Sequence, residues 1–565
     1  MQKGINGSAG IGMGNAVIIR EQDLTFDEDS YLGEEQELVK LDQAMAVFAE
    51  KTELLAKRME QQIGEKEAAI LRGHIILADD PEIYTQLKDA ILGGKSAEAS
   101  VVQVFDFFAQ IFESTGDELT MQRATDLRDI KTRLLAILLQ KEEIDISQVP
   151  EGTILIAKDL TPSMTTGLNT EHVAGILTET GGRTSHSAIL ARALEIPAVL
   201  SVAGICELAN PGDFILMDGN TGEVWIDPEQ EVIDAYRIRQ EQEKLQREEL
   251  KKLVGRKTQT KDKTEKELFA NIGSAADVEK VMASGGEGIG LFRTEFLFMN
   301  RTDIPTEEEQ FQAYRTVAEA MQGKEVIIRT MDIGGDKEVP ALGMDKEENP
   351  FLGFRAIRYC LRRKEIYQAQ LRAILRASAF GNIKIMIPLV TGVDELRQVK
   401  KMVAEIAEEL DNKKIEYQKE IEVGVMMETP AACLMADILA KEAAFFSIGT
   451  NDLTGYTMAA DRGNANVSYL CSSYQPPVLR AIASIIASAK KEGIKVGMCG
   501  EAAADIRMIP LLLGFGLDEF SVSASAILRT RKVIADWSIA DAKNLADRVM
   551  EQSTEAEVCK ILESV

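Results

Sequence analysis

The chain has 565 residues, of which 45% are hydrophobic and 27% charged, and a net charge of −27, so it is too long for one core and we expect three or four domains. An acidic excess of this size disfavours nucleic acid and anionic membrane as partners and suits a basic protein partner, although solubility alone would also explain it. The six cysteines include no CxxC pair, which argues against a disulfide framework. The amino terminus has no apolar segment and no apolar run approaches ~18 residues, which argues against a secretory signal and a membrane span. Together these features predict a cytoplasmic protein.

The amino-terminal part of the chain predicts an α/β domain interrupted by helices. Residues 1–20 are rich in glycine and end in a β-like run, NAVIIR. Residues 21–147 carry apolar residues at spacings of three and four, as in LDQAMAVFAEKTELLAKRMEQQI, which predicts helices. Short strands alternate with helical pieces over residues 148–228, which indicates that 1–20 and 148–228 together form a compact α/β domain. The charged segment 229–255 predicts a helical linker.

After residue 256 the sequence becomes rhythmic. Eight candidate strands, separated by amphipathic helices, are expected at 267–273, 288–296, 325–335, 383–390, 421–430, 444–452, 495–501 and 518–525. Eight strand–helix units over roughly 300 residues predict a (β/α)8 TIM barrel over 256–565. The fold class is therefore multidomain α/β, with a carboxyl-terminal barrel and an α/β domain that carries an all-α insertion over 21–147.

Charged residues follow the predicted barrel strands, where barrel active sites lie. Any one of them alone would most often be a surface ion pair. Jointly, the arginines predict bidentate recognition of phosphate or carboxylate, and two of the carboxylates, Glu428 and Asp452, are suited to hold Mg²⁺. Cys499 is either a small buried residue or an acid that protonates a carbon atom. The charged and amide residues at these ends are Arg293, Glu295, Arg329, Asp332, Arg355, Arg358, Glu428, Asn451, Asp452, Arg462 and Glu501.

The stretch GGRTSHSAILAR contains one of only three histidines in the chain. Its two glycines favour a turn, and Thr184 or Ser185 is suited to cap the helix that follows. His186 then lies in the first turn of a helix, where free N–H groups favour a phosphate, and a neutral imidazole there is a nucleophile able to carry a phosphoryl group. A packed or solvated histidine is the structural alternative. For His74, contact with a partner and local packing are both open.

Eight motifs, in the same order along essentially the whole chain, resemble the phosphoenolpyruvate–protein phosphotransferases, enzyme I of the bacterial sugar phosphotransferase system. These motifs are GGRTSHSAILARALEIPAV, GIGLFRTEFLFMNR, RTMDIGGDK, NPFLGFRAIR, VGVMMETPAA, FFSIGTNDLTGYTMAADRGN, MCGEAAAD and LLLGFGLDEFSVS. The resemblance implies that phosphoenolpyruvate binds at the barrel with Mg²⁺. It also implies that His186 takes the phosphoryl group and passes it to a histidine of the phosphocarrier protein HPr, docked on the helices of 21–147. The family works as a homodimer through the barrel domain.

The resemblance also assigns roles to individual residues. It implies that Cys499 protonates the pyruvate enolate, that Glu428 and Asp452 hold the metal, and that Thr165 orients His186. The substrate-binding residues that it implies are Arg293, Arg329, Arg355, Asn451 and Arg462. The chain departs from the family pattern at Gly455, in 470–479 and after Glu501, at positions that none of these roles requires.

Three related enzymes are alternative interpretations of these motifs. Pyruvate phosphate dikinase and phosphoenolpyruvate synthase need an ATP-grasp domain, for which residues 1–150 leave no room, and the nitrogen-branch form of enzyme I carries an additional amino-terminal domain. A non-catalytic regulatory paralogue that only binds the carrier protein is the alternative from another functional class. The presence of every residue with an implied catalytic role favours the enzyme.

Overall fold

The computed structural model describes residues 1–19, 24–27, 30–62, 65–114, 118–141, 149–160, 164, 168–182, 185–299, 301, 303–334, 339–345, 347–462, 464 and 466–564. The chain forms two compact units, Met1–Leu245 and Gln246–Val565. In the part of the chain that is described, we find no helix with the length and apolar character that crossing a membrane requires.

Strands in the first unit form one sheet, which has eight strands over the described residues. Its order is β1-β8-β7-β3-β4-β5-β6-β2, with parallel pairing from β3 to β6 and antiparallel pairing elsewhere. The apolar run TILIA of β4 is buried along its whole length, as expected for a parallel strand covered on both faces. The strands are β1 (Gln2–Lys3), β2 (Ile5–Ser8), β3 (Ile11–Ile19), β4 (Thr153–Ala157), β5 (Val173–Thr178), β6 (Ala198–Leu200), β7 (Phe214–Asp218) and β8 (Glu223–Ile226).

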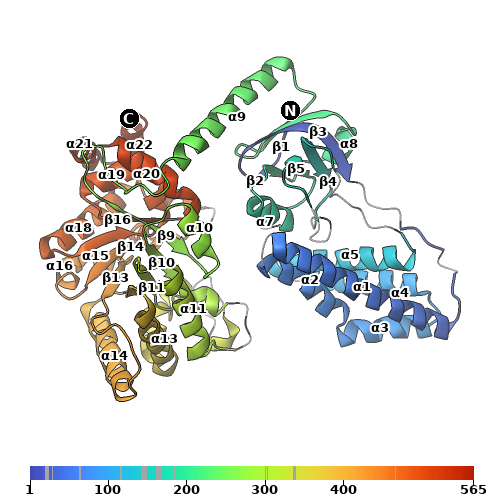
Figure 1. The fold of residues 1–565 in the computed structure, drawn as a ribbon, viewed down its shortest axis with the longest axis horizontal. Helices are drawn as coiled ribbons and strands as arrows, with labels where there is room; N and C mark the ends of the chain where they lie inside the picture. The colour runs from blue at the N-terminus through green and yellow to red at the C-terminus, as the bar shows by residue number, and fades with distance from the viewer. Residues whose placement is uncertain are drawn as a thin grey trace. The chain divides into compact units, whose positions relative to one another are not determined.

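Helices are inserted between β3 and β4 and lie side by side in Figure 1. They pack around the buried side chains of Phe48, Leu87, Phe105 and Leu134. All of them fall within the range that the sequence predicted to be helical. They are α1 (Glu34–Gln62), α2 (Glu65–Ala78), α3 (Pro81–Leu92), α4 (Ala97–Ser114) and α5 (Glu118–Leu138).

The charged segment after β8 forms helix α9 (Gln230–Lys251), as predicted, and none of its residues is buried. The sheet also carries two short helices, α7 (His186–Ala193) and α8 (Ile205–Leu208). Of these, α7 begins at the histidine that the sequence singled out.

The second unit contains a closed barrel of parallel strands in the order β10-β11-β12-β13-β14-β15-β16-β9. All eight strands lie within the segments predicted from the sequence, so the predicted fold class is confirmed. A small apolar cluster that includes Leu291, Met386 and Phe445 lies apart from the main core of this unit. The strands are β9 (Glu267–Ile272), β10 (Ile289–Arg293), β11 (Val326–Arg329), β12 (Ile383–Ile387), β13 (Val423–Met427), β14 (Phe445–Ile448), β15 (Lys495–Met498) and β16 (Glu519–Val522).

Helices alternate with these strands and surround them in Figure 1. Amphipathic helices such as α14 turn one apolar stripe, with Leu396, Val399 and Ile406, toward the core. The α-helices of this unit are α10 (Asp277–Ala283), α11 (Glu307–Ala320), α12 (Ala356–Arg362), α13 (Lys364–Ala377), α14 (Val393–Asn412), α15 (Pro430–Leu434), α16 (Ala436–Leu439), α17 (Thr450–Met458), α18 (Pro476–Glu492), α19 (Met508–Phe515), α20 (Ile527–Asp536), α21 (Ile539–Met550) and α22 (Glu555–Leu562).

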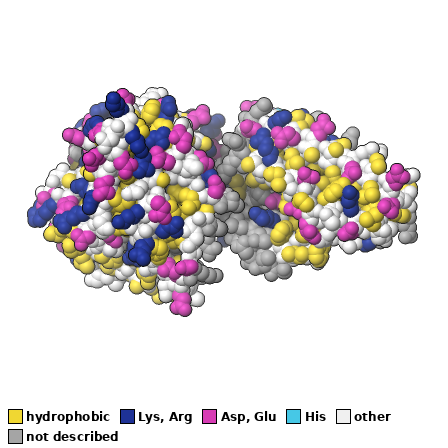
Figure 2. All heavy atoms as spheres, turned by 90° about the horizontal axis from the view of Figure 1, so that it is seen from below, with side chains coloured by type: hydrophobic (Ala, Val, Ile, Leu, Met, Phe, Trp, Pro, Cys, Tyr) yellow, Lys and Arg dark blue, Asp and Glu magenta, His cyan; other side chains and the backbone are white. Residues whose placement is uncertain are grey.

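Charged side chains of both signs are interspersed on the face of the molecule that Figure 2 shows. Neither unit presents on that face an extended surface of basic residues, the feature that favours binding of nucleic acid.

Candidate active site

His186 is the first residue of α7, and the turn before it is set by Gly181 and Ser185. Gly181 has φ of +101°, a left-handed conformation that glycine adopts without strain. Ser185 is the N-cap residue, and its hydroxyl accepts a hydrogen bond from the Ala188 N–H at 3.3 Å. Of the two caps that the sequence offered, Ser185 therefore fills the role, and Thr184 lies outside the described residues.

Ser187 fixes the first turn of α7 against the segment that follows β4. Its side chain is fully buried. The Ser187 hydroxyl donates to Asp159 Oδ1 at 2.7 Å and accepts from the Leu160 N–H at 3.2 Å. These two bonds hold the backbone of the residue next to His186. Thr165, which the family resemblance gave an orienting role, lies outside the described residues.

Arg329 ends strand β11 and is buried between two carboxylates. Its Nη2 lies 2.5 Å from Glu295 Oε1, and its Nη1 lies 2.9 Å from Asp332 Oδ2. Burial alone would lower the pKa of the guanidinium, but the negative charges of Asp332 and Glu295 outweigh burial and raise it. Arg329 is therefore a fixed positive charge at the carboxyl end of the barrel.

Arg355 is the residue before α12 and shares Asp332 with Arg329. Its Nη2 lies 2.8 Å from Asp332 Oδ1 and 3.4 Å from Asp452 Oδ2, and its Nη1 donates to Tyr456 Oη at 3.3 Å. The backbone of Gly334, with φ of +112°, packs so closely against Arg355 that a side chain there would collide with it. A single carboxylate, Asp332, thus joins two buried arginines that are 26 residues apart in the chain.

Glu428 follows β13 directly and is buried close to other carboxylates. Its Oε1 accepts a hydrogen bond from the Leu389 N–H at 2.6 Å, and a Cβ at Gly449 would lie only 2.6 Å from its Oε2. Burial raises the pKa of the Glu428 carboxyl, and the nearby negative charges of Asp452 and Asp332 raise it further. A divalent cation held by Glu428 and Asp452 would relieve this repulsion, so the pair fits the ligand chemistry of Mg²⁺.

Cys499 follows β15 and is buried in the apolar cluster of the barrel. Its Sγ donates a weak hydrogen bond to the carbonyl oxygen of Ile448 at 3.8 Å. Burial raises the pKa of the Cys499 thiol to about 11. The thiol consequently keeps its proton at neutral pH, which is the state that a proton donor requires.

Three predicted residues remain. Arg293 and Asn451 lie at the carboxyl ends of β10 and β14, and Arg462 comes later in the chain, after α17. Arg293 is the exposed last residue of β10, and Arg462 is exposed in the segment after α17. Asn451, in the first turn of α17, donates from Nδ2 to Glu501 Oε1 at 3.2 Å. Among the described residues, Arg293 and Asn451 form no hydrogen bond or ion pair with the buried cluster. That cluster, called here the rim cluster, consists of Arg329, Arg355, Glu428, Asp452 and Cys499.

Sequence reasoning missed three residues that hold the rim cluster together. Glu295 and Asp332 were noted at strand ends without a function, although their side chains neutralise the buried arginines. Tyr456 was not noted at all, although its hydroxyl contacts Arg355 and donates to the Phe351 carbonyl oxygen at 2.5 Å. Its position four residues after Asp452, one helical turn away, was the available signal.

Comparison with known families places the chain in a class that this architecture fits. Residues 247–539 match "PEP-utilising enzyme, PEP-binding domain", 149–222 match "PEP-utilising enzyme, mobile domain", and 3–123 match "PEP-utilising enzyme, N-terminal". The barrel with its rim cluster falls in the first match, and His186 falls in the second. The chain is thus built as a phosphoenolpyruvate-utilising enzyme.

Individual relatives narrow the class. The phosphoenolpyruvate-protein phosphotransferase of Priestia megaterium is 45% identical over 563 residues, covering 100% of this chain and 98% of the relative. The proteins of the same name from Staphylococcus carnosus (strain TM300) and Bacillus subtilis (strain 168) are also 45% identical, over 99% and 98% of this chain and 98% of each relative. The chain belongs to the phosphoenolpyruvate-protein phosphotransferase family. The family and the transferase class predicted from the sequence are confirmed.

Proposed function

We propose that the chain transfers the phosphoryl group of phosphoenolpyruvate to its own His186, releases pyruvate, and passes the group to a histidine of the carrier protein HPr. The rim cluster is the observation that carries this proposal. It combines buried guanidinium groups for an anion, a carboxylate pair for a cation, and a protonated thiol, all at the end of the barrel where active sites lie.

Arginines bind and orient the substrate in this proposal. Arg329 and Arg355 are already fixed by Asp332, so little side-chain freedom is lost when they bind phosphate and carboxylate oxygens. Arg293 and Arg462, both exposed, supply two further positive charges, and Asn451 supplies an amide donor. A trianionic substrate is thereby held by groups from several strands.

Glu428 and Asp452 are the residues that would hold Mg²⁺. The PEP-utilising enzyme family to which the chain belongs uses a metal cofactor. The carboxylate pair fits a hard cation that takes its other ligands from water and substrate oxygens. When bound, the ion neutralises negative charge on the phosphoryl group. Glu428 and Asp452 would hold the ion, and Asp452 also pairs with Arg355, since its Oδ2 lies 3.4 Å from Arg355 Nη2.

Two residues of the protein, His186 and Cys499, take part in the bond changes. The Nε2 atom of His186 forms a bond to phosphorus while the bond from phosphorus to the enol oxygen breaks, which leaves pyruvate enolate. The Cys499 thiol then gives its proton to the methylene carbon and yields pyruvate. His186 belongs to the first unit, so the reaction requires it to reach the anion held by the second.

The carrier protein and the dimer partner are proposed from the family resemblance and from exposed apolar side chains on the helical insertion. We propose that HPr docks on the helical insertion of 21–147, where large hydrophobic side chains are exposed on α1, α2 and α4 at Val47, Leu54, Ile76 and Phe107. We further propose that 1–20 and 148–228 form the phosphohistidine domain, 229–255 a linker, and 256–565 the barrel through which the enzyme dimerises in the cytoplasm.

Release of pyruvate tests this proposal. With phosphoenolpyruvate and Mg²⁺ but no carrier, we expect about one pyruvate per chain in a single burst, since His186 can hold one phosphoryl group. Addition of HPr should convert the burst into continuous release. Continuous pyruvate release in the absence of HPr, beyond the single burst, would contradict the proposal. A burst of equal size in the His186→Ala variant would contradict it as well.

A further inference from the structure

A pocket of about 630 Å³ opens at the amino-terminal end of the barrel strands. It is formed where three neighbouring strands begin: Lys266 precedes β9, Lys495 begins β15, and Asp518 precedes β16. The rim cluster lies at the carboxyl ends of the strands, so this pocket is at the opposite end of the barrel. Catalysis in barrels takes place at the carboxyl end, which makes the pocket a candidate for binding alone.

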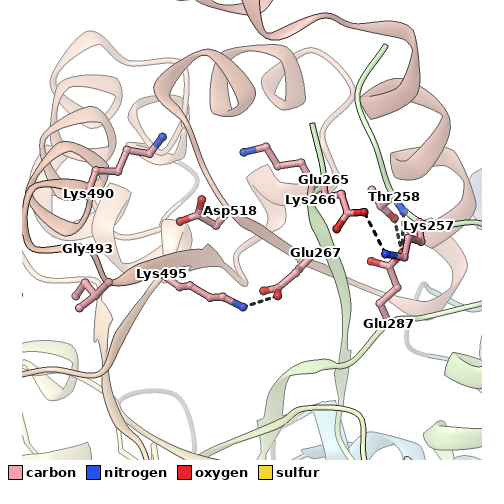
Figure 3. A pocket seen from close by; sticks show the side chains of 11 residues that line it. Lys257, Thr258, Glu265, Lys266, Glu267, Glu287, Lys490, Gly493, Lys495 and Asp518 are labelled. Atoms are coloured by element: carbon pink, nitrogen blue, oxygen red, sulfur yellow. Dashed lines mark hydrogen bonds and ion pairs between the residues drawn. The ribbon is translucent and has the colours of Figure 1, made fainter. Parts of the chain in front are cut away.

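Several charges on the pocket wall are neutralised within the protein (Figure 3). Lys495 Nζ lies 2.5 Å from Glu267 Oε1, and Lys257 Nζ lies 3.1 Å from Glu265 Oε1. Glu287 accepts hydrogen bonds through Oε1 from the Thr258 N–H and hydroxyl. Arg531 Nη2 lies 3.7 Å from the same Glu287 oxygen and offsets its negative charge. These groups therefore offer hydrogen bonds to a ligand but little net charge.

Lys266 and Lys490 differ from these pairs because neither forms an ion pair within the described residues. Lys266 is half-buried, and its Nζ donates to the Leu517 carbonyl oxygen at 2.6 Å. Lys490 Nζ lies against Gly516, whose φ of +94° and lack of a side chain leave room for the ammonium group. Both ammonium groups therefore converge on the short loop between α19 and β16, and in Figure 3 the two side chains point toward one another.

Charge at this point of the pocket is unbalanced. Asp518 lies beside the two lysines and contributes one negative charge, while its Oδ2 also accepts the Val496 N–H at 3.1 Å. Burial lowers the pKa of Lys266; the charge of Asp518 acts in the opposite direction, and the positive charge of Lys490 lowers it again. Two ammonium groups against one carboxylate leave one positive charge in excess at this part of the wall, where Lys266 is half-buried and Lys490 is exposed. An anion between the lysines would offset both the burial and the mutual repulsion.

The favourable interaction of lysines with the end of a helix does not by itself account for the position of Lys490. Lysines in the last turn of a helix stabilise its negative end, and α18 has two there, Lys490 and Lys491. Either one would serve the helix from solvent. Both lysines are exposed, but Lys490 lines the pocket and meets a second lysine from another segment, whereas Lys491 lies outside the pocket.

We propose that this pocket binds a small doubly charged anion, a phosphate monoester or a dicarboxylate, between the ammonium groups of Lys266 and Lys490. The paired charges and Thr258 around it supply hydrogen bonds for the rest of the ligand. The proposal does not rest on the function assigned to the rim cluster, and its ligand does not compete with a substrate at the other end of the barrel.

Ile494, which lines the pocket, provides a local reporter. In the full-length chain labelled with ¹³C at isoleucine methyl groups, glycerol 3-phosphate and malonate are titrated separately at constant ionic strength, with chloride as the reference anion. We expect the Ile494 methyl resonance to shift and saturate with at least one of the two probes. Saturation with glycerol 3-phosphate alone identifies a phosphate monoester site, saturation with malonate alone identifies a dicarboxylate site, and saturation with both supports the shared anion chemistry. The methyl group of Ile448, at the end of β14, reports separately on anions bound near the rim cluster.

Matched variants separate a specific site from general ionic effects. Lys490→Met and Lys266→Met should each raise the dissociation constant of the probe, measured at Ile494, at least tenfold. Lys491→Met, one position away from Lys490, should leave this constant unchanged. The other isoleucine resonances verify that each variant is folded. The proposal would be overturned if neither probe shifts the Ile494 methyl resonance more than chloride does. It would also be overturned if Lys490→Met and wild type bind the probe with the same dissociation constant.

Discussion

Stability of the helical insertion should depend on pH through one buried histidine. His74, on α2, is 1% exposed. Its Nε2 lies 3.2 Å from Asp126 Oδ1 and its Nδ1 lies 3.4 Å from Asp129 Oδ2, both on α5. Burial lowers the pKa of the imidazole, but the two carboxylates outweigh burial and raise it to about 9. The ring is therefore a buried cation that joins two helices.

The sign of the effect follows from the direction of this shift. An unfolded histidine has a pKa of about 6.5, so the folded state binds the proton more tightly. The resulting stabilisation is complete below about pH 6.5 and is lost as the pH rises to about 9. At about 1.4 kcal/mol per pKa unit, a shift from about 6.5 to about 9 corresponds to roughly 3.5 kcal/mol, or about 300-fold in the opening equilibrium. About a hundredfold of this change falls between pH 6.5 and pH 9.5, because the unfolded histidine is already half deprotonated at pH 6.5.

Hydrogen exchange measured on peptides from α2 and α5 tests this magnitude. After correction for the intrinsic exchange rate, protection should fall by about a hundredfold between pH 6.5 and pH 9.5 in wild type and in His172→Gln, which alters a histidine outside the helices. In His74→Gln the protection should be lower at pH 6.5 and nearly independent of pH. Equal pH dependence in His74→Gln and wild type would refute the assignment.

Three further predictions concern the rim cluster. Cys499→Ala should slow pyruvate formation by about 10² to 10⁴-fold, because an acid is removed from the step that protonates carbon, while the yield of phosphorylated protein stays unchanged; a pyruvate assay beside a phosphorylation assay checks this. Gly334→Ala should lower kcat/KM for phosphoenolpyruvate by roughly 10²-fold through displacement of Arg355, whereas Gly343→Ala, at φ of +57° with nothing within 4 Å, should cost only about 1 to 2 kcal/mol of stability. Tyr456→Phe should raise KM about threefold to tenfold with a smaller effect on kcat, since it removes one hydrogen bond to Arg355; an unchanged KM would show that Arg355 needs no support from this hydroxyl.

Barrel strands could be predicted from the sequence because each is a short, mainly apolar run, and most of them end next to a charged or polar residue. Runs such as IKIMI and VGVMM are buried along their whole length. Strands β1 and β6 were missed because they have only two and three residues, too few to show a period. Strand β2 was missed because its sequence, INGS, contains only one apolar residue. Their pairing depends on partners far away in the chain, as between Ile5 and Leu200.

Membership of the rim cluster was predictable, whereas its internal pairing was not. The rule that strand ends meet at one end of a barrel located Arg329, Glu428 and Cys499. It does not reveal that Asp332 binds two arginines, because that depends on the path of the segment before α12. The same holds for His74: the sequence left a partner contact and local packing open, and its burial against α5 favours packing.

Phosphorylation of His186 is the central claim and is measured most directly with phosphate-labelled phosphoenolpyruvate and Mg²⁺, in the absence of any carrier protein. Wild type and His172→Ala should each acquire a label that is labile in acid and stable in base, at about one per chain, and His186→Ala should acquire none. Folded wild-type protein that takes up no label would contradict the account and favour a paralogue that only binds the carrier. A His186→Ala variant that is labelled as fully as wild type would contradict it too, because the phosphoryl group would then be carried by another residue.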